Sequence, residues 1–119
     1  MDELDPVFSA VAEYFAVLSE PTRLKIMHAL CNGEQSVSAI VAETGATQTN
    51  VSRHLALMHR HGVLARRKHG TTVLYRIADE TMLELCRSVC TRIAATLEER
   101  RPLKRHFLRL MPAQKRRAA

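Results

Sequence analysis

A run of polar residues from Gln48 to His54 carries the side chains best suited to recognising another molecule. Val51, Leu55 and Met58 are spaced by four and three positions, so they lie on one face of a helix. The other faces carry amide, hydroxyl and guanidinium groups and no acid. Such groups pair with base edges in the major groove of duplex DNA, and Arg53 is the best candidate to bind guanine. The residues of this helix expected to contact DNA are Gln48, Thr49, Asn50, Ser52, Arg53 and His54.

A group of cations follows this helix. Arg66, Arg67 and Lys68 are consecutive, and residues 51–76 contain no acidic side chain. Clustered cations bind phosphate regardless of base sequence, so they add affinity more than specificity. A solvated surface turn is the alternative interpretation. The residues expected to contact the DNA backbone are Arg66, Arg67, Lys68, His69 and Thr71.

The three cysteines are the candidates for redox or metal chemistry. Cys86 and Cys90 are four residues apart, so both thiols would lie on one face of a helix. They could bind a soft metal or metalloid ion such as As(III), Zn(II) or Cu(I), with Cys31 or a partner chain as a third ligand. They could instead react with an oxidant or reactive sulfur, or simply pack in an apolar core. The sequence leaves these alternatives open, so no metal or cofactor is assigned.

Catalytic chemistry is not expected from this sequence. The chain has no Ser/His/Asp constellation and no pair of acids on a cleft-like element, and its four glycines form no phosphate-binding loop. His59, His61 and His69 do not have the spacing of a zinc site. His28 is expected to be a partly buried packing residue.

Four helices are expected to position the polar run. The first two begin with prolines that follow capping residues, near positions 5 and 20. Ser36 and Thr47 are the expected N-caps of the third and fourth helices, and Gly45 and Gly62 are expected just beyond their ends. These last two helices would form a helix-turn-helix with the polar run on its second helix.

A β-hairpin and a long helix complete the predicted fold. Segments 62–68 and 72–77 have β-branched and aromatic residues on either side of a tight turn, which is typical of a hairpin. A helix over about 80–99 follows the capping residue Asp79. The fold class is therefore mainly α with a small β-hairpin wing (α+β): a winged helix-turn-helix in the order α-α-α-α-β-β-α.

The composition favours a polyanionic partner. The net charge is +6 and the isoelectric point is about 9.8. No apolar run approaches the roughly 20 residues needed to span a bilayer, and the acidic residues at positions 2, 3 and 5 are unlike a signal peptide. A cytoplasmic protein without membrane association is expected, with its cysteines reduced.

Two segments, LSEPTRLKIMHAL (18–30) and QTNVSRHLALMHRHGVLARRKHGTTVLYRI (48–77), resemble the ArsR/SmtB-type winged-helix repressors of bacteria. With the closing amphipathic helix, the resemblance covers roughly residues 8–97. It implies a homodimer formed through the first and last helices, an inverted-repeat operator in double-stranded DNA, and an inducer that releases the protein from it.

The sensor sites usual in that family are not matched by this sequence. Metal-sensing members use a Cys-x-Cys pair on the third helix, but residues 33–37 contain no cysteine. Others use Asp, His and Glu on the last helix, where Thr81 and Arg92 stand in place of the expected histidines. Further members sense reactive sulfur through cysteines on the second and last helices, the elements that carry Cys31, Cys86 and Cys90.

The first helix and the last helix each have a stripe of apolar residues, and these two stripes agree with a homodimer. Together they carry more apolar surface than a thin domain can cover, and such patches usually mark an interface. Packing of the two stripes within one chain is the alternative. The residues expected at the dimer interface are Phe8, Val11, Phe15, Met82, Leu85, Val89, Ile93 and Leu97.

At 119 residues, the chain is expected to form one domain. Residues 1–99 would be the DNA-binding and dimerisation domain, and 100–119 a basic extension with a short helix followed by disorder. Two other functions stay open: a DNA-binding regulator that needs no ligand, and a module whose cations meet acidic residues of another protein.

Overall fold

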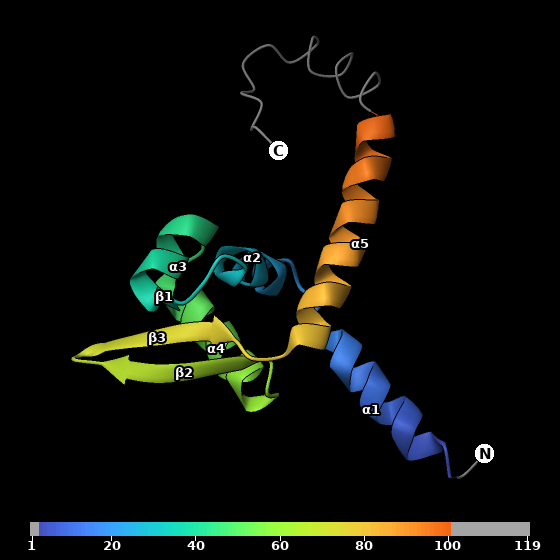
Figure 1. The fold of residues 1–119 in the computed structure, drawn as a ribbon, viewed down its shortest axis with the longest axis horizontal. Coiled ribbons are helices and arrows are strands. Elements are labelled where there is room, and N and C mark those ends of the chain that lie inside the picture. Colours follow the sequence, from blue (N-terminus) through green and yellow to red (C-terminus); the bar gives the residue numbers. More distant parts are fainter. Residues whose placement is uncertain (1–2, 101–119) are drawn as a thin grey trace. The chain divides into compact units, whose positions relative to one another are not determined.

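The computed structural model describes residues 3–100 of the chain. The helices are α1 (Asp5–Ala16), α2 (Pro21–Leu30), α3 (Val37–Thr44), α4 (Gln48–Arg60) and α5 (Glu80–Glu99), and the strands are β1 (Gln35–Ser36), β2 (Leu64–His69) and β3 (Thr72–Ile77). Figure 1 shows the β2–β3 hairpin extending away from the helices α2 to α4. The predicted winged helix-turn-helix fold is confirmed. The basic extension predicted over 100–119 lies almost entirely outside the described residues.

Side-chain caps start the central helices where the sequence predicts them. The hydroxyl of Ser36 accepts a hydrogen bond from the amide of Ala39, at 3.2 Å, at the start of α3. Thr47 accepts the Asn50 amide at 3.2 Å and so starts α4. Each cap satisfies a backbone donor that the first helical turn leaves without a partner. The short turn between α3 and α4 is therefore fixed by local hydrogen bonds.

The end of α4 is fixed by a glycine. Gly62 has a φ of 77°, in the left-handed region that favours glycine. The amide of Val63 then bonds the carbonyl of Met58 at 3.0 Å, a Schellman closure. The Val63 carbonyl in turn accepts the amide of Ala78 at 2.9 Å. The helix end and the base of the hairpin are thus joined by backbone hydrogen bonds.

The sheet has a strand that the sequence did not predict. Its order is β1-β3-β2, and the two residues of β1 pair antiparallel with Tyr75 and Leu74 of β3. A strand of two residues shows no alternation of apolar and polar side chains in the sequence. It is a strand only because β3 supplies its hydrogen-bond partners. Its consequence is that the start of α3 is hydrogen-bonded to the wing.

One apolar core lies beneath α4. Val51, Leu55 and Met58 are fully buried there, together with Ile26 of α2 and Ile40 of α3. The helices α2, α3 and α4 pack on one another, and α4 also contacts β2. This arrangement leaves the opposite face of α4 exposed.

The chain divides into two compact units, residues 1–86 and 87–119, and α5 runs from the first into the second. In the first unit Met82 is fully buried and belongs to the core. Its assignment to the dimer interface was therefore wrong, because helical spacing does not distinguish a core residue from an interface residue. Leu85 is half-buried.

Several predicted interface residues are exposed. In the first unit α1 has no buried residue, and Phe8 and Phe15 are 55% and 52% exposed. In the second unit α5 exposes its own apolar row. The exposed large apolar side chains are Leu4, Val7, Phe8, Val11, Phe15, Val89, Ile93 and Leu97. Within residues 3–100, no helix combines the length and apolar character needed to cross a bilayer.

Candidate nucleic-acid interface

The exposed face of α4 presents most of the polar groups expected to contact DNA. Gln48, Thr49, Ser52 and Arg53 are exposed, and Asn50 is half-buried. The first turn of α4 contains no acidic residue. The helix dipole and the free amides of this end favour a negatively charged partner.

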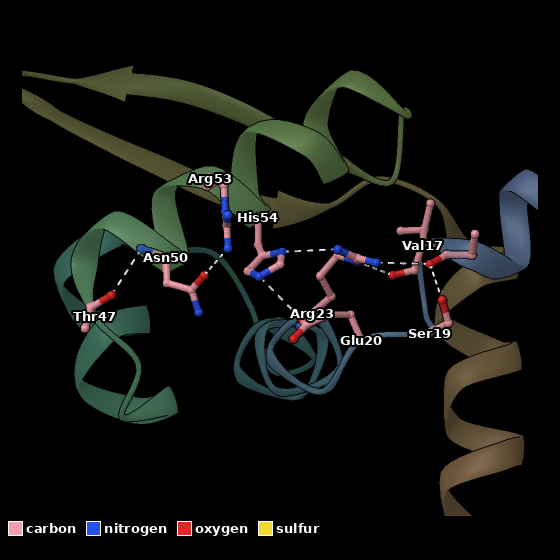
Figure 2. A network of polar contacts seen from close by, with 9 residues as sticks. Val17, Ser19, Glu20, Arg23, Thr47, Asn50, Arg53 and His54 are labelled. Carbon is pink, nitrogen blue, oxygen red and sulfur yellow. Dashed lines mark hydrogen bonds and ion pairs between the residues drawn. The ribbon is translucent and has the colours of Figure 1, made fainter.

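Arg53 is held in a defined orientation by its neighbour one turn earlier. Its Nη2 donates a hydrogen bond to Oδ1 of Asn50 at 2.6 Å (Figure 2). Arg53 is exposed, and its remaining guanidinium N–H groups keep the fork geometry that suits guanine O6 and N7. Asn50 therefore has two roles open to it: direct base contact and orientation of Arg53.

His54 departs from the sequence prediction. It was expected to contact DNA, but its side chain is buried, at 7% exposure. Its Nδ1 lies 3.2 Å from Nη1 of Arg23, and its Nε2 lies 3.4 Å from Oε2 of Glu20. Figure 2 shows the ring directed from α4 toward the start of α2. His54 is three residues after Val51 and four before Met58. This spacing places it at the edge of the buried face of α4, which explains its burial.

The protonation of His54 follows from its partners. An arginine has only donors, so Nδ1 must accept from Arg23, and Nε2 carries the proton that faces Glu20. Burial lowers the pKa of His54 from its ordinary 6.5, and the charges of Arg23 and Arg53 lower it further, against the charge of Glu20. The neutral imidazole is therefore the form that fits this site.

Arg23 joins three helices. Its Nε donates to the Val17 carbonyl at 2.6 Å and its Nη2 to the Ala16 carbonyl at 3.1 Å, while Nη1 faces His54. Glu20 accepts the Arg23 amide at 3.0 Å. Burial raises the pKa of Glu20, but the backbone hydrogen bonds from Arg23 and Thr22, with the charge of Arg23, hold it below its usual value. The end of α1, the start of α2 and the middle of α4 thus share one polar network.

The wing has two different faces. Side chains directly opposite across an antiparallel ladder lie on the same face. Arg66 pairs with Tyr75 and Lys68 with Val73; Tyr75 is buried, so this face is the one turned toward the core. The side chains lining a shallow hollow at this part of the wing are Val37, Arg66, Arg67, Lys68, Val73 and Tyr75.

Arg67 has a carboxylate partner. It pairs with Leu74 on the opposite face of the wing, and its Nε and Nη2 donate to the two oxygens of Glu34 at 2.8 and 2.7 Å. These bonds hold the pKa of Glu34 below its ordinary value, aided by the charges of Arg76 and His69. Arg66, Lys68, His69 and Thr71 are exposed, whereas the guanidinium of Arg67 is already engaged.

The cysteines lie in three different environments. Cys31, at the end of α2, is half-buried, Cys86 is buried in the core, and Cys90 is exposed on α5. Among residues 3–100, no three His, Cys, Asp or Glu side chains are grouped so that they could hold a metal ion. Asp79 is occupied otherwise: its oxygens accept the Met82 amide at 3.0 Å and the Tyr14 hydroxyl at 2.9 Å.

The sequence analysis missed several polar residues and predicted the wrong environment for two, His28 and His54. Glu20, Arg23 and Glu34 were not identified, although the first two belong to the LSEPTRL segment that carries the resemblance. The available signal for Glu20 and Arg23 was a pair of opposite charges three residues apart at the start of a helix, with Glu20 as the N-cap and Arg23 in the first turn. Glu34 had none, because its partner is 33 residues away. His28 was expected to be partly buried and is exposed.

The sequence relationships agree with this geometry. A profile of the family described as "Bacterial regulatory protein, arsR family" matches residues 20–65. The HTH-type transcriptional regulator Rv0081 of Mycobacterium tuberculosis is 30% identical over 99 residues, which cover 82% of this chain and 87% of that protein. The chain belongs to the arsR family of bacterial regulatory proteins. Its homologues and its fold are those of DNA-binding transcriptional regulators and not of enzymes.

Solved structures of similar proteins share the fold. The crystal structure of M. tuberculosis Rv0081 matches with a TM-score of 0.70 at 30% identity, over 81% of this chain and 97% of that one. The homodimeric winged helix-turn-helix domain of Mb0332 from Mycobacterium bovis matches with a TM-score of 0.72 at 31% identity, over 83% and 92%. A probable mercury resistance operon repressor of Streptomyces lividans is 32% identical over 102 residues, which cover 75% of this chain and 82% of that protein.

Proposed function

We propose that the protein is a dimeric transcriptional repressor that binds an inverted-repeat operator through α4 and the wing. The observation that carries the proposal is the anchoring of α4. Its buried residues Val51, Leu55 and Met58 fix the helix, and its opposite face offers exposed hydrogen-bond donors and acceptors without an acid. A helix of this kind at the second position of a helix-turn-helix enters the major groove with its first residues.

The base contacts are proposed to come from the first two turns of α4. Arg53 is proposed to bind guanine, and Gln48, Thr49, Asn50 and Ser52 to contact neighbouring bases or phosphates. Arg66 and Lys68, with His69 and Thr71, are proposed to contact the backbone. His54 is excluded from this set because it is buried.

The dimer is proposed to form through α1 and α5. Each of these helices leaves a row of large apolar side chains exposed, which a second copy of the chain would cover. The Mb0332 domain, similar over most of its length, is homodimeric. Two-fold symmetry would then present two copies of α4 to half-sites about 34 Å, or a multiple of that distance, apart.

Operator binding tests the proposal. We expect Arg53→Ala to cost about 1–3 kcal/mol of binding free energy and to relax specificity at one base pair, measured by gel-shift titration against operator variants. Arg60→Ala is the matched control, because Arg60 is an exposed arginine at the other end of α4. It removes the same charge but should keep the base preference. An unchanged operator affinity for Arg53→Ala would remove this assignment.

The inducer is proposed to act through the thiols. The S. lividans relative is a probable mercury resistance operon repressor, and mercury is a thiol-binding metal. Cys31 and Cys90 are at least partly accessible, whereas Cys86 packs in the core. Two inducers fit: an oxidant or reactive sulfur species, or a soft metal ion. The described residues of one chain supply no three-ligand group, so a metal site would need a further ligand from outside them, and a cysteine of a second copy is our proposal.

Thiol counting separates these inducers. A loss of thiols after peroxide or polysulfide, together with loss of operator binding, would support the redox mechanism. Release by Hg(II) or As(III) with recovery after chelation would support the metal mechanism. Operator binding that neither treatment changes would indicate a regulator without a thiol input.

A further inference from the structure

We infer that Arg67 is a positioning residue that holds the wing through Glu34, and that it is not one of the wing's phosphate contacts. The inference rests on the proposed DNA-binding function and divides the three consecutive cations of β2 into two roles. Arg66 and Lys68 would meet the phosphate backbone. Arg67 would fix the direction in which they are presented.

The sheet register creates the pair. Ser36 of β1 and Arg67 of β2 both pair with Leu74 of β3, so the three residues form one row across the sheet. Glu34 lies directly before β1 and on the same side as Arg67. The contact therefore joins the loop after α2 to the middle of the wing, and it forms only when the short strand β1 is in place.

The geometry of the pair is that of a strong surface contact. Both N–H groups of one edge of the guanidinium donate to both carboxylate oxygens, at 2.8 and 2.7 Å. The Arg67 side chain is 54% exposed and that of Glu34 25% exposed. Exposed ion pairs contribute little unless their geometry is bidentate. Here the planar guanidinium also fixes the orientation of the Arg67 side chain relative to the Glu34 carboxylate, which a lysine could not do.

The alternation of the strand supports the division of roles. Arg66 and Lys68 lie on the core-side face of the hairpin, together with Tyr75 and Val73, and Arg67 lies on the other face. A hairpin laid along DNA with one face cannot direct all three of these side chains at the same phosphates. The carboxylate of Glu34 also disfavours a phosphate next to Arg67. If Arg67 bound the phosphate, Glu34 would lose its partner and its negative charge would stay next to the DNA.

The salt dependence of binding tests the inference. Each phosphate contact contributes about 0.9 to the slope of log K against log salt concentration. We expect Arg66→Gln to lower that slope by about 0.9 for each wing, measured by fluorescence anisotropy with a labelled mixed-sequence duplex of about 30 base pairs. Arg67→Gln should leave the slope unchanged while weakening binding at every salt concentration.

Glu34→Gln gives predictions of opposite sign for the two roles. If Arg67 positions the wing, binding weakens severalfold although the protein gains positive charge. The charge-swapped variant Glu34→Arg/Arg67→Glu should then restore binding. If Arg67 is a restrained phosphate contact, Glu34→Gln tightens binding and steepens the slope. That result, or a lower slope for Arg67→Gln, would overturn the inference.

A measurement without DNA separates this inference from the proposed function. Hydrogen–deuterium exchange of residues 64–77 should become faster in Arg67→Gln and in Glu34→Gln. It should return toward the wild-type rate in the charge-swapped variant and stay unchanged in Arg66→Gln. If none of these variants changes the exchange rate of residues 64–77, the positioning role is overturned. A wild-type protein that fails to bind the duplex would instead overturn the proposed function.

Discussion

Arg23 of α2 and His54 of α4 are joined by a contact of 3.2 Å between Nη1 and Nδ1. The arginine also bonds two carbonyls at the end of α1, and the histidine faces Glu20 with its other nitrogen. Two segments that identify the family in sequence therefore meet in space. These polar side chains therefore support α4 from within the protein.

This contact predicts a pH dependence of stability. The pKa of His54 is below 6.5 in the folded chain, so the unfolded chain binds more protons as the pH falls. The contribution of His54 is fully present above about pH 6.5 and is lost as the pH falls through its folded pKa. Urea melts between pH 7.5 and 5 should show this decline. His54→Gln should flatten it, whereas His61→Gln, at an exposed position, should leave it unchanged.

The cap of α4 predicts a local loss of stability. Thr47→Ala removes the acceptor of the Asn50 amide and should cost about 1 kcal/mol of unfolding free energy. Thr47→Ser retains the oxygen and should cost much less. Because the cap orders the first turn of α4, the alanine variant should also weaken operator binding. A Thr47→Ala protein with wild-type urea midpoint and affinity would contradict this view.

The bond between Tyr14 and Asp79 predicts a coupling between α1 and the start of α5. Burial raises the pKa of Tyr14 to about 12, with the hydrogen bond to Asp79 and its negative charge adding to the effect. Tyr14→Phe should cost about 0.5–1.5 kcal/mol. A double-mutant cycle with Asp79→Ala should show that the two losses are not additive. Simple additivity would indicate that the bond contributes nothing measurable.

Met82 and Ile93 should respond differently to truncation. Met82 is fully buried in the first unit, so Met82→Ala should cost about 2–5 kcal/mol of unfolding free energy. Ile93 is 52% exposed, and in the proposed dimer a second copy would cover it. Ile93→Ala should therefore weaken self-association, measured by sedimentation, and lower stability mainly at low protein concentration. Equal effects in both measurements would argue against the division into core and interface.

Local chemistry explains what the sequence could predict. The caps Ser36, Thr47 and Asp79 and the stop at Gly62 act within a few residues, so their positions were correct. The apolar spacing of α4 correctly identified its buried side.

Contacts between distant segments explain what the sequence could not predict. Strand β1 exists because β3 lies beside it, and the pairing of Arg67 with Glu34 depends on that register. His54 was assigned to the wrong side because a histidine at the edge of a helical stripe can face either way. Met82 shows the same ambiguity for an apolar residue.

The order of the sheet has a consequence for how the protein behaves at high concentration. Strand β2 forms its outer border, and one side of its backbone has no neighbouring strand within the described residues. Such a border can recruit a strand from another molecule and begin aggregation. Here Arg66, Arg67, Lys68 and His69 are consecutive along it. Two wings approaching border to border would bring like charges together, so the cations keep the protein dispersed as well as attracting a polyanion.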